Sequence, residues 1–207
     1  MKKLLCRIRL SSVVMFITLT GMILMSGCAR YARNVNALYE PVATVANATG
    51  EVYIVVPESQ QSRTSDIKWV LGKVKDDENM KIDEVFSPRS PAELIQAALA
   101  RELAKAGYTV IPATKNPGAK QRVIDVTKTE VNLEQVSDFA DLKATCRVLI
   151  GLDVSRNGQL LKKLQYESSS SKTDIKGRDL LAASVLQDAL QSVMKNAIPD
   201  LSDLLLK

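Results

Sequence analysis

The chain has 207 residues, with 28 lysines and arginines, 23 aspartates and glutamates, and no histidine. The lack of histidine excludes Ser-His-Asp and Cys-His catalytic sites and removes the commonest zinc ligand. Four of the basic side chains lie within the first nine positions, and the rest of the chain is close to neutral. This balance excludes the basic surface that nucleic-acid binding requires.

The N-terminus has the layout of a bacterial lipoprotein signal. A basic start precedes an apolar run over about residues 10–24, which is shorter than the roughly 20 apolar residues that a spanning helix needs. The run ends in Leu24-Met25-Ser26-Gly27-Cys28, which looks like a lipobox, with Met25 in the place where leucine is usual. We expect cleavage between Gly27 and Cys28 and acylation of Cys28. The alternative is an uncleaved membrane anchor with an incidental cysteine.

This signal divides the chain into three parts. Residues 1–27 are expected to be the signal peptide, 28–50 the lipidated N-terminus with a tether, and 51–207 a single periplasmic domain. Ala29 favours the periplasmic leaflet of the outer membrane, because aspartate at this place retains enteric-type lipoproteins in the inner membrane. Cys6 leaves with the signal and Cys28 carries lipid, so Cys146 has no partner for an intramolecular disulfide.

The first half of the domain reads as strands around one helix. Residues 51–57 and 68–74 are rich in strand-forming side chains, and residues 82–86 suggest a short edge piece. Ser90-Pro91-Ala92-Glu93 is a capping box with proline at the first helical position, and Gly107 fits the left-handed residue after the helix end at about Ala106. A short strand over 108–112 follows.

The second half reads as three strands and a helix. A strand is predicted over 122–133, and from Leu142 to Val154 alternate residues are apolar, which places Cys146 on a buried face. Asn157-Gly158 indicates a two-residue hairpin with a return strand over 160–167, and the serines 168–171 are expected to be its frayed end or a loop. A final helix is predicted over 177–197, ended by Pro199, with one further helical turn open over 200–206.

Together these elements predict an α+β fold. We expect a two-layer sandwich in which two amphipathic helices cover one face of a mainly antiparallel sheet. For Cys146 we expect the role of a small buried hydrophobic side chain, and the alternative is an intermolecular disulfide or a reactive thiol.

The order of these features resembles a known family. The lipobox, the strand over 52–57, the helix–Gly–strand unit over 94–110, the long hairpin and the terminal helix around Ile198–Ser202 are similar to the YajG-type bacterial lipoproteins, a family without a chemical motif. More distantly they resemble the auxiliary lipoproteins of ABC-type transport systems. The resemblance implies the fold class and an envelope location, and it implies no catalytic residues.

No catalytic, cofactor or metal site is predicted. Asp76, Asp77 and Glu78 lack the spacing of a calcium loop and are expected to form a solvated turn. We therefore expect a non-enzymatic envelope lipoprotein that is attached to the membrane through lipid on Cys28 and binds or assembles with an envelope protein that the sequence does not identify. The alternatives are a transporter auxiliary subunit with a lipid ligand in a groove between sheet and helices, and a component of a secretion or motility machine.

Overall fold

The computed structural model describes residues 33–42, 48–60, 68–118, 121–138, 141–175 and 178–206. The predicted signal, Gly27 and Cys28 lie outside these residues. The described elements, in chain order, are β1 (Glu51–Val55), the short 3-10 helix η1 (Glu58–Gln60), β2 (Trp69–Lys75), β3 (Lys81–Ser87), α2 (Pro91–Ala106), β4 (Thr109–Ala113), β5 (Arg122–Ser137), β6 (Leu142–Arg156), β7 (Gln159–Asp174) and α3 (Arg178–Leu206).

The strands form one mixed sheet organised around β5. On one side β5 pairs antiparallel with β6 along its whole length, and β6 pairs antiparallel with β7. On the other side the start of β5 pairs parallel with β1 and its end pairs parallel with β2. The outer neighbours are β4, parallel to β1, and β3, antiparallel to β2. One edge of β5 thus carries two separate strands.

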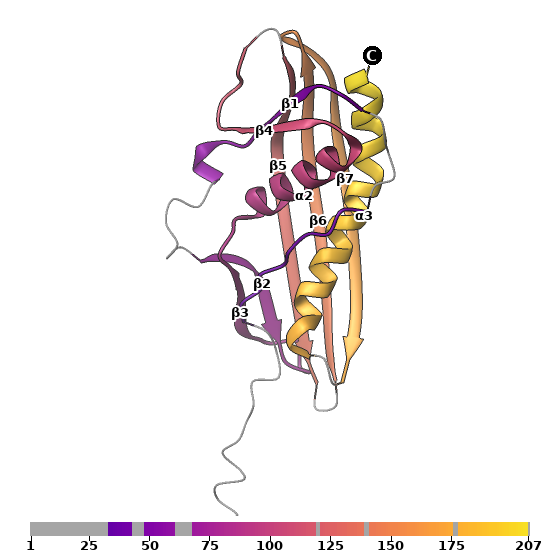
Figure 1. Cartoon of the computed structure of the whole chain (residues 1–207). Coiled ribbons are helices and arrows are strands. Elements are labelled where there is room, and N and C mark those ends of the chain that lie inside the picture. The colour runs from indigo at the N-terminus through magenta and orange to yellow at the C-terminus, as the bar shows by residue number, and fades with distance from the viewer. Residues whose placement is uncertain are drawn as a thin grey trace, which may run out of the picture. The chain divides into compact units, whose positions relative to one another are not determined.

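The predicted α+β class and its two long helices are confirmed, and Figure 1 shows α2 and α3 in front of the sheet. The prediction of a mainly antiparallel two-layer sandwich describes the fold only in part, because β1, β2 and β4 add parallel pairs and the sheet curls. Hairpin signals in a sequence mark antiparallel neighbours. They give no information on which distant strands lie parallel.

The helix α2 begins and ends as its sequence predicts. The Ser90 side chain accepts the Glu93 N–H at 3.1 Å, and the Ser90 N–H donates to the Glu93 carboxylate at 2.7 Å. Gly107 follows the helix in the left-handed conformation, with φ of 113°. A Cβ at this position would lie 2.3 Å from the carbonyl oxygen of Ala48, so glycine is required by both conformation and space.

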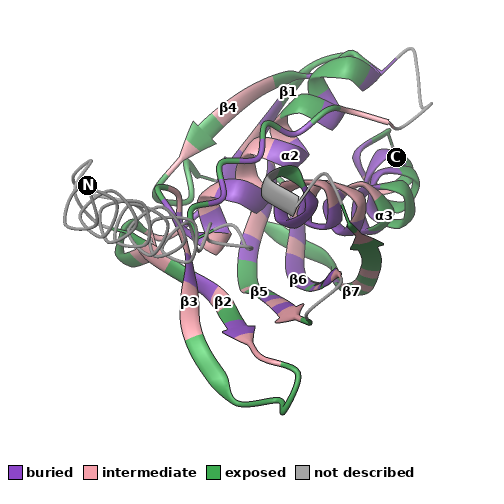
Figure 2. Ribbon diagram, turned by 90° about the horizontal axis from the view of Figure 1, so that it is seen from below, coloured by how far each residue is buried: buried purple, intermediate pink, exposed green. Residues whose placement is uncertain are grey.

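The core lies between the helices and the concave face of the sheet (Figure 2). Every second residue of β6 from Leu142 to Val154 is buried there, as the alternation predicts. Cys146 is among them and is fully buried, and burial raises the pKa of its thiol to about 12. The interpretation of Cys146 as a small buried hydrophobic side chain is therefore confirmed.

This burial makes the thiol chemically silent. At about pH 8, Cys146 in the folded protein is expected to react with a thiol reagent at least about 100-fold more slowly than after unfolding, because almost none of it is thiolate. The measurement is a timed absorbance assay with and without denaturant, with Cys146→Ser as the blank. Fast labelling of the folded protein would support the reactive-thiol alternative instead.

Two predicted ends are wrong. The serines Ser168–Ser171 are part of β7, which pairs with β6 as far as Asp174, because β6 is long enough to give each serine a partner. The final helix does not end at Pro199 and continues to Leu206. Proline removes one helical N–H and crowds the preceding turn, but Leu201 and Leu205 beyond it are fully buried, and this packing offsets the cost.

The predicted tether over 28–50 is also wrong in the part that the structure describes. Residues 33–42, here called the strap, pack on the domain with Val35, Ala37 and Tyr39 buried. Ala48 is buried as well, and its N–H donates to the carbonyl of Ala106 at 3.0 Å. The strap alternates buried and exposed side chains like a strand, and this alternation gives it an apolar face to bury.

Candidate functional site: the strap and the outer face of the sheet

The strap begins as an extension of the sheet at β3. The Val35 N–H donates to the Phe86 carbonyl and the Phe86 N–H donates to the Arg33 carbonyl, both at 2.8 Å. Arg33 also forms an ion pair with Asp83 at 2.5 Å. Two backbone hydrogen bonds and an ion pair therefore hold the chain at residue 33, near the point where it leaves the part described.

The strap then crosses α2, where a buried carboxylate holds it. Glu102 is fully buried and accepts hydrogen bonds from the Tyr39 hydroxyl and, at 2.7 Å, from the Val42 N–H. Arg101 and Lys105 on the same helix donate to the carbonyls of Tyr39 and Pro41, at 2.5 and 3.1 Å. Burial raises the pKa of Tyr39 above its usual value of 10, and the hydrogen bond to Glu102 raises it further. The hydroxyl therefore remains a donor throughout the physiological pH range.

These contacts shorten the connection to the predicted lipid. Only the four residues 29–32 separate Cys28 from Arg33, the first strap residue. The five residue-to-residue steps from Cys28 to Arg33 span at most about 18 Å when fully extended. A lipid on Cys28 would thus be joined to the domain by a short link, whereas a free segment over 28–50 would reach several times further.

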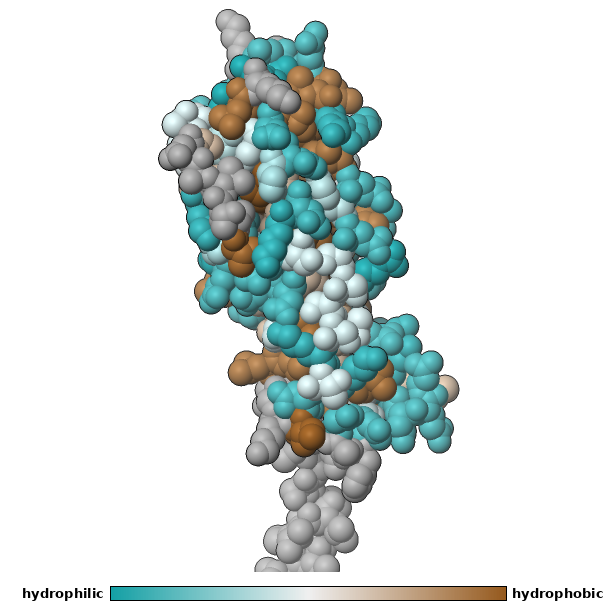
Figure 3. Space-filling model, turned by 90° about the vertical axis from the view of Figure 1, so that its right-hand side faces the viewer, coloured by the Kyte–Doolittle hydropathy of each residue, from teal (hydrophilic) through white to brown (hydrophobic). Residues whose placement is uncertain are grey.

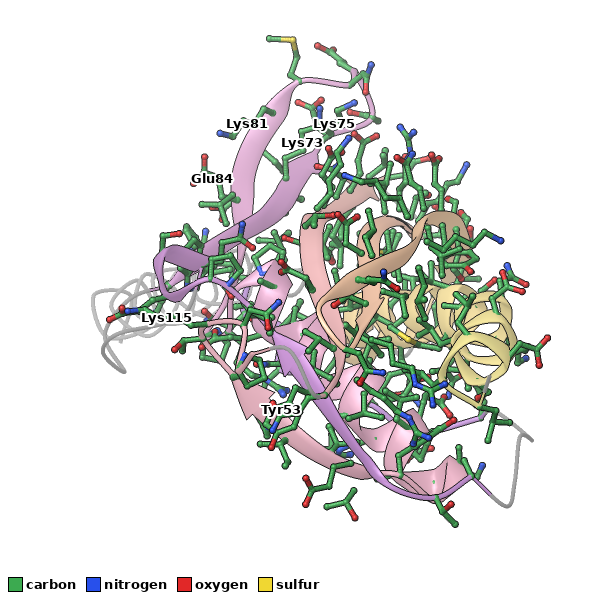
Figure 4. The ribbon with its side chains drawn as sticks, turned by 90° about the horizontal axis from the view of Figure 1, so that it is seen from above. Tyr53, Lys73, Lys75, Lys81, Glu84 and Lys115 are labelled. Carbon is green, nitrogen blue, oxygen red and sulfur yellow. The ribbon has the colours of Figure 1, made fainter. Side chains whose placement is uncertain are left out.

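The outer face of the sheet, opposite the helices, is open and charged. A groove of about 530 Å³ lies over β2, β3 and β5. Its charged groups include Lys73, Lys81, Glu84 and Glu134, and Figure 4 shows the first three on the β2–β3 hairpin together with Lys75. Lys73 and Lys75 lie 3.5 and 3.0 Å from Glu134, and Lys81 lies 2.5 Å from Glu84. Two lysines thus share Glu134, and the group of three lysines and two glutamates keeps one unbalanced positive charge.

Further ion pairs continue across β6 and β7. Arg147 contacts Glu167 at 2.6 Å, and this hydrogen bond lowers the pKa of Glu167. Asp125 and Asp153 lie opposite each other on β5 and β6, and Lys163 lies 3.2 Å from Asp153. Burial raises the pKa of Asp125, and the charge of Asp153 adds to this effect. Such a surface suits polar contact with another macromolecule, and its exposed ion pairs contribute little to stability.

The other residues that the sequence singled out are those of the lipobox and of the acidic turn. Cys28 and Gly27 lie outside the described residues. Asp76, Asp77 and Glu78 lie in the turn between β2 and β3, and no group of three or more metal-ligating side chains is found in the described ranges. Among these residues no helix has the length and apolar character needed to cross a bilayer.

Sequence reasoning missed the Tyr39–Glu102 contact. Glu102 lies one helical turn from both Leu99 and Ala106, so its position on the apolar stripe of α2 is the signal that could have identified it.

Comparisons with known proteins found distant structural similarity. No family model and no curated protein matches the chain. A Xanthomonas campestris protein of the family DUF330 is 12% identical, covers 83% of this chain and 94% of its own, and has a TM-score of 0.45. A minor lipoprotein from Acinetobacter baumannii is 8% identical, with coverages of 75% and 89% and a TM-score of 0.32. A Helicobacter pylori homologue of neuraminyllactose-binding hemagglutinin is 12% identical, with coverages of 82% and 94% and a TM-score of 0.38.

These neighbours include a lipoprotein and a protein named for binding, but the similarity is too low to carry a function to this chain. The resemblance to YajG-type lipoproteins stays a prediction.

Proposed function

We propose that this protein is a lipoprotein, cleaved after Gly27 and acylated at Cys28, that acts as a non-enzymatic binding or assembly module on the periplasmic leaflet of the outer membrane. The observation that carries the proposal is the strap. The strap begins four residues after the lipobox and is fixed to β3 and α2, and this arrangement would keep the folded domain close to a lipid anchor. The polar outer face of the sheet would remain available to a partner.

The anchor is tested by Cys28→Ser. The variant is expected to lose essentially all acyl label from radioactive palmitate and to keep its signal, because neither acylation nor lipoprotein signal cleavage has a thiol to act on. Cys6→Ser is the matched control, since Cys6 lies within the signal and its loss should leave labelling unchanged. Full acylation of Cys28→Ser would contradict the proposal. Density fractionation of membranes that carry the wild-type protein tests separately whether it lies in the outer or the inner membrane.

The alternative of a transporter auxiliary subunit gains no support from the structure. That function predicts an apolar groove between the sheet and the helices. In the described part of the chain this interface is filled by fully buried side chains such as Leu99, Ile124 and Leu186. The groove found on the outer face lies on the opposite side of the sheet from the helices, and charged side chains such as Lys73 and Glu134 line it beside the apolar Val70 and Val131.

A further inference from the structure

The three outer strands of the sheet differ in how their edges are protected. β4 is five residues long and contains Pro112, and β3 is capped at Phe86 by the strap. β7 has 16 residues without proline or glycine, and within the described residues it pairs only with β6. A long exposed edge of this kind is a template for another strand, which proteins normally shorten or cover.

We propose that β7 pairs with β7 of a second copy of this chain, antiparallel and with Ser168 opposite Ser168, so that two sheets become one. A second copy of this chain would thus be the partner in the proposed assembly function, and the inference rests on that function.

The two ends of β7 are complementary. Apolar side chains are exposed at both: Leu160 and Leu161 at 53% and 43% near its start, and Ile175 and Leu180 at 68% and 74% just after its end. Antiparallel pairing places the start of one β7 beside the end of the other, so Leu161 of each copy lies opposite Ile175 of the other. Figure 3 looks onto this side of the molecule and shows brown patches toward its two ends.

The charges select one register. Opposed residues of an antiparallel pair point to the same side of a sheet, so helix-facing residues must oppose helix-facing residues. With Ser168 at the two-fold axis, Lys162 lies opposite Asp174. A shift of the axis by one residue toward the N-terminus places Lys162 opposite Lys172 and Glu167 opposite its own copy, and a shift the other way places Asp174 opposite the apolar Leu164. Like charges directly opposite each other are destabilising, so the register at Ser168 is favoured.

The centre of the edge offers no obstacle. Ser168–Ser171 are small, uncharged and partly or fully exposed. On the helix side, α3 contacts β6 and β7 about equally, which places it roughly midway between them. With strands about 4.8 Å apart, two such helices related by the axis would lie about 10 Å apart, which is an ordinary helix-packing distance.

The test uses the full chain extracted from membranes in detergent. Ser168→Cys is expected to give a reducible dimer in high yield on mild oxidation. Ser171→Cys is the matched control and should give little, because two such residues would lie about 20 Å apart across the axis. Equal yields from both variants, or none from Ser168→Cys while its thiol can be labelled, would overturn the pairing. If the anchor proposal fails instead, Cys6 and Cys28 remain as thiols and cross-link the wild type as well.

A charge swap tests the register independently. Lys162→Glu and Asp174→Lys are each expected to weaken dimerisation in analytical ultracentrifugation about tenfold, because each creates two like-charge oppositions. The double variant K162E/D174K is expected to restore it. These two residues lie about 40 Å apart along one β7, so they can compensate each other only between copies. A monomeric wild type, or a double variant without rescue, would contradict the proposal.

Discussion

Gly72→Ala is expected to destabilise the protein by about 3 kcal/mol or more, or to prevent folding. A Cβ at this position would lie 1.6 Å from the carbonyl oxygen of Leu133 and 2.5 Å from its carbonyl carbon. Both are backbone atoms, so no side-chain rotation can relieve the clash. β2 would have to move away from β5 and lose the pairing that joins Gly72–Lys75 to Leu133–Val136. Urea unfolding followed through Trp69, the single tryptophan, measures the loss.

Gly118→Ala is the matched control for this prediction. Gly118 has φ of 118°, and no atom lies within 4 Å of the position that a Cβ would take. The control therefore carries only the conformational cost of alanine in the left-handed region, about 1–2 kcal/mol. A loss at Gly72 no greater than that at Gly118 would show that β2 and β5 are not in close backbone contact.

The parts of the fold that could be predicted depend on local signals. The capping box and Gly107 define α2 within 18 residues of chain, and the alternation in β6 identifies its buried face directly. The pairing of β5 with β1 and β2 could not be predicted. Gly72 and Leu133, for example, are 61 positions apart, and the sequence of neither segment indicates its partner strand. The helix beyond Pro199 and the strand through the serines likewise depend on packing partners that local propensity does not contain.

The residues of the candidate site also differ in whether a local sequence signal predicts them. Cys28 is a chemical motif and could be predicted from five consecutive residues. The strap could not, because its apolar residues are few and Leu38, the largest aliphatic among them, is 64% exposed. A glutamate in an amphipathic helix ordinarily lies in solvent, so Glu102 has meaning only once Tyr39 and Val42 are placed against it. Two segments about 60 residues apart specify this contact together.

Glu102→Ala is therefore expected to free the strap and to cost about 3 kcal/mol, since the Tyr39 hydroxyl and the Val42 N–H both lose their acceptor in a buried site. Hydrogen exchange should rise at the amides of residues 37–40 and 42 by more than it rises in β5 and β6. Lys105→Ala is the matched control on the same helix. Its bond to the Pro41 carbonyl is exposed, so it should cost about 0.5 kcal/mol or less.

Alkaline titration tests the contact between Tyr39 and Glu102 through the Tyr39 hydroxyl. The pKa of Tyr39 is raised in the folded state, by burial first and by Glu102 second, so its contribution to stability is fully present below pH 10 and declines as the pH rises above that value. Tyr39→Phe should remove this part of the decline, and the raised pKa values of Tyr108 and Tyr166 should leave a smaller one. If strap amides stay protected in Glu102→Ala, the buried carboxylate does not hold the strap. The hydrogen bonds at Phe86 and the Arg33–Asp83 ion pair do not involve Glu102, so the start of the strap should stay on β3 in this variant. Glu102 therefore holds the part of the strap that crosses α2, and β3 holds its start.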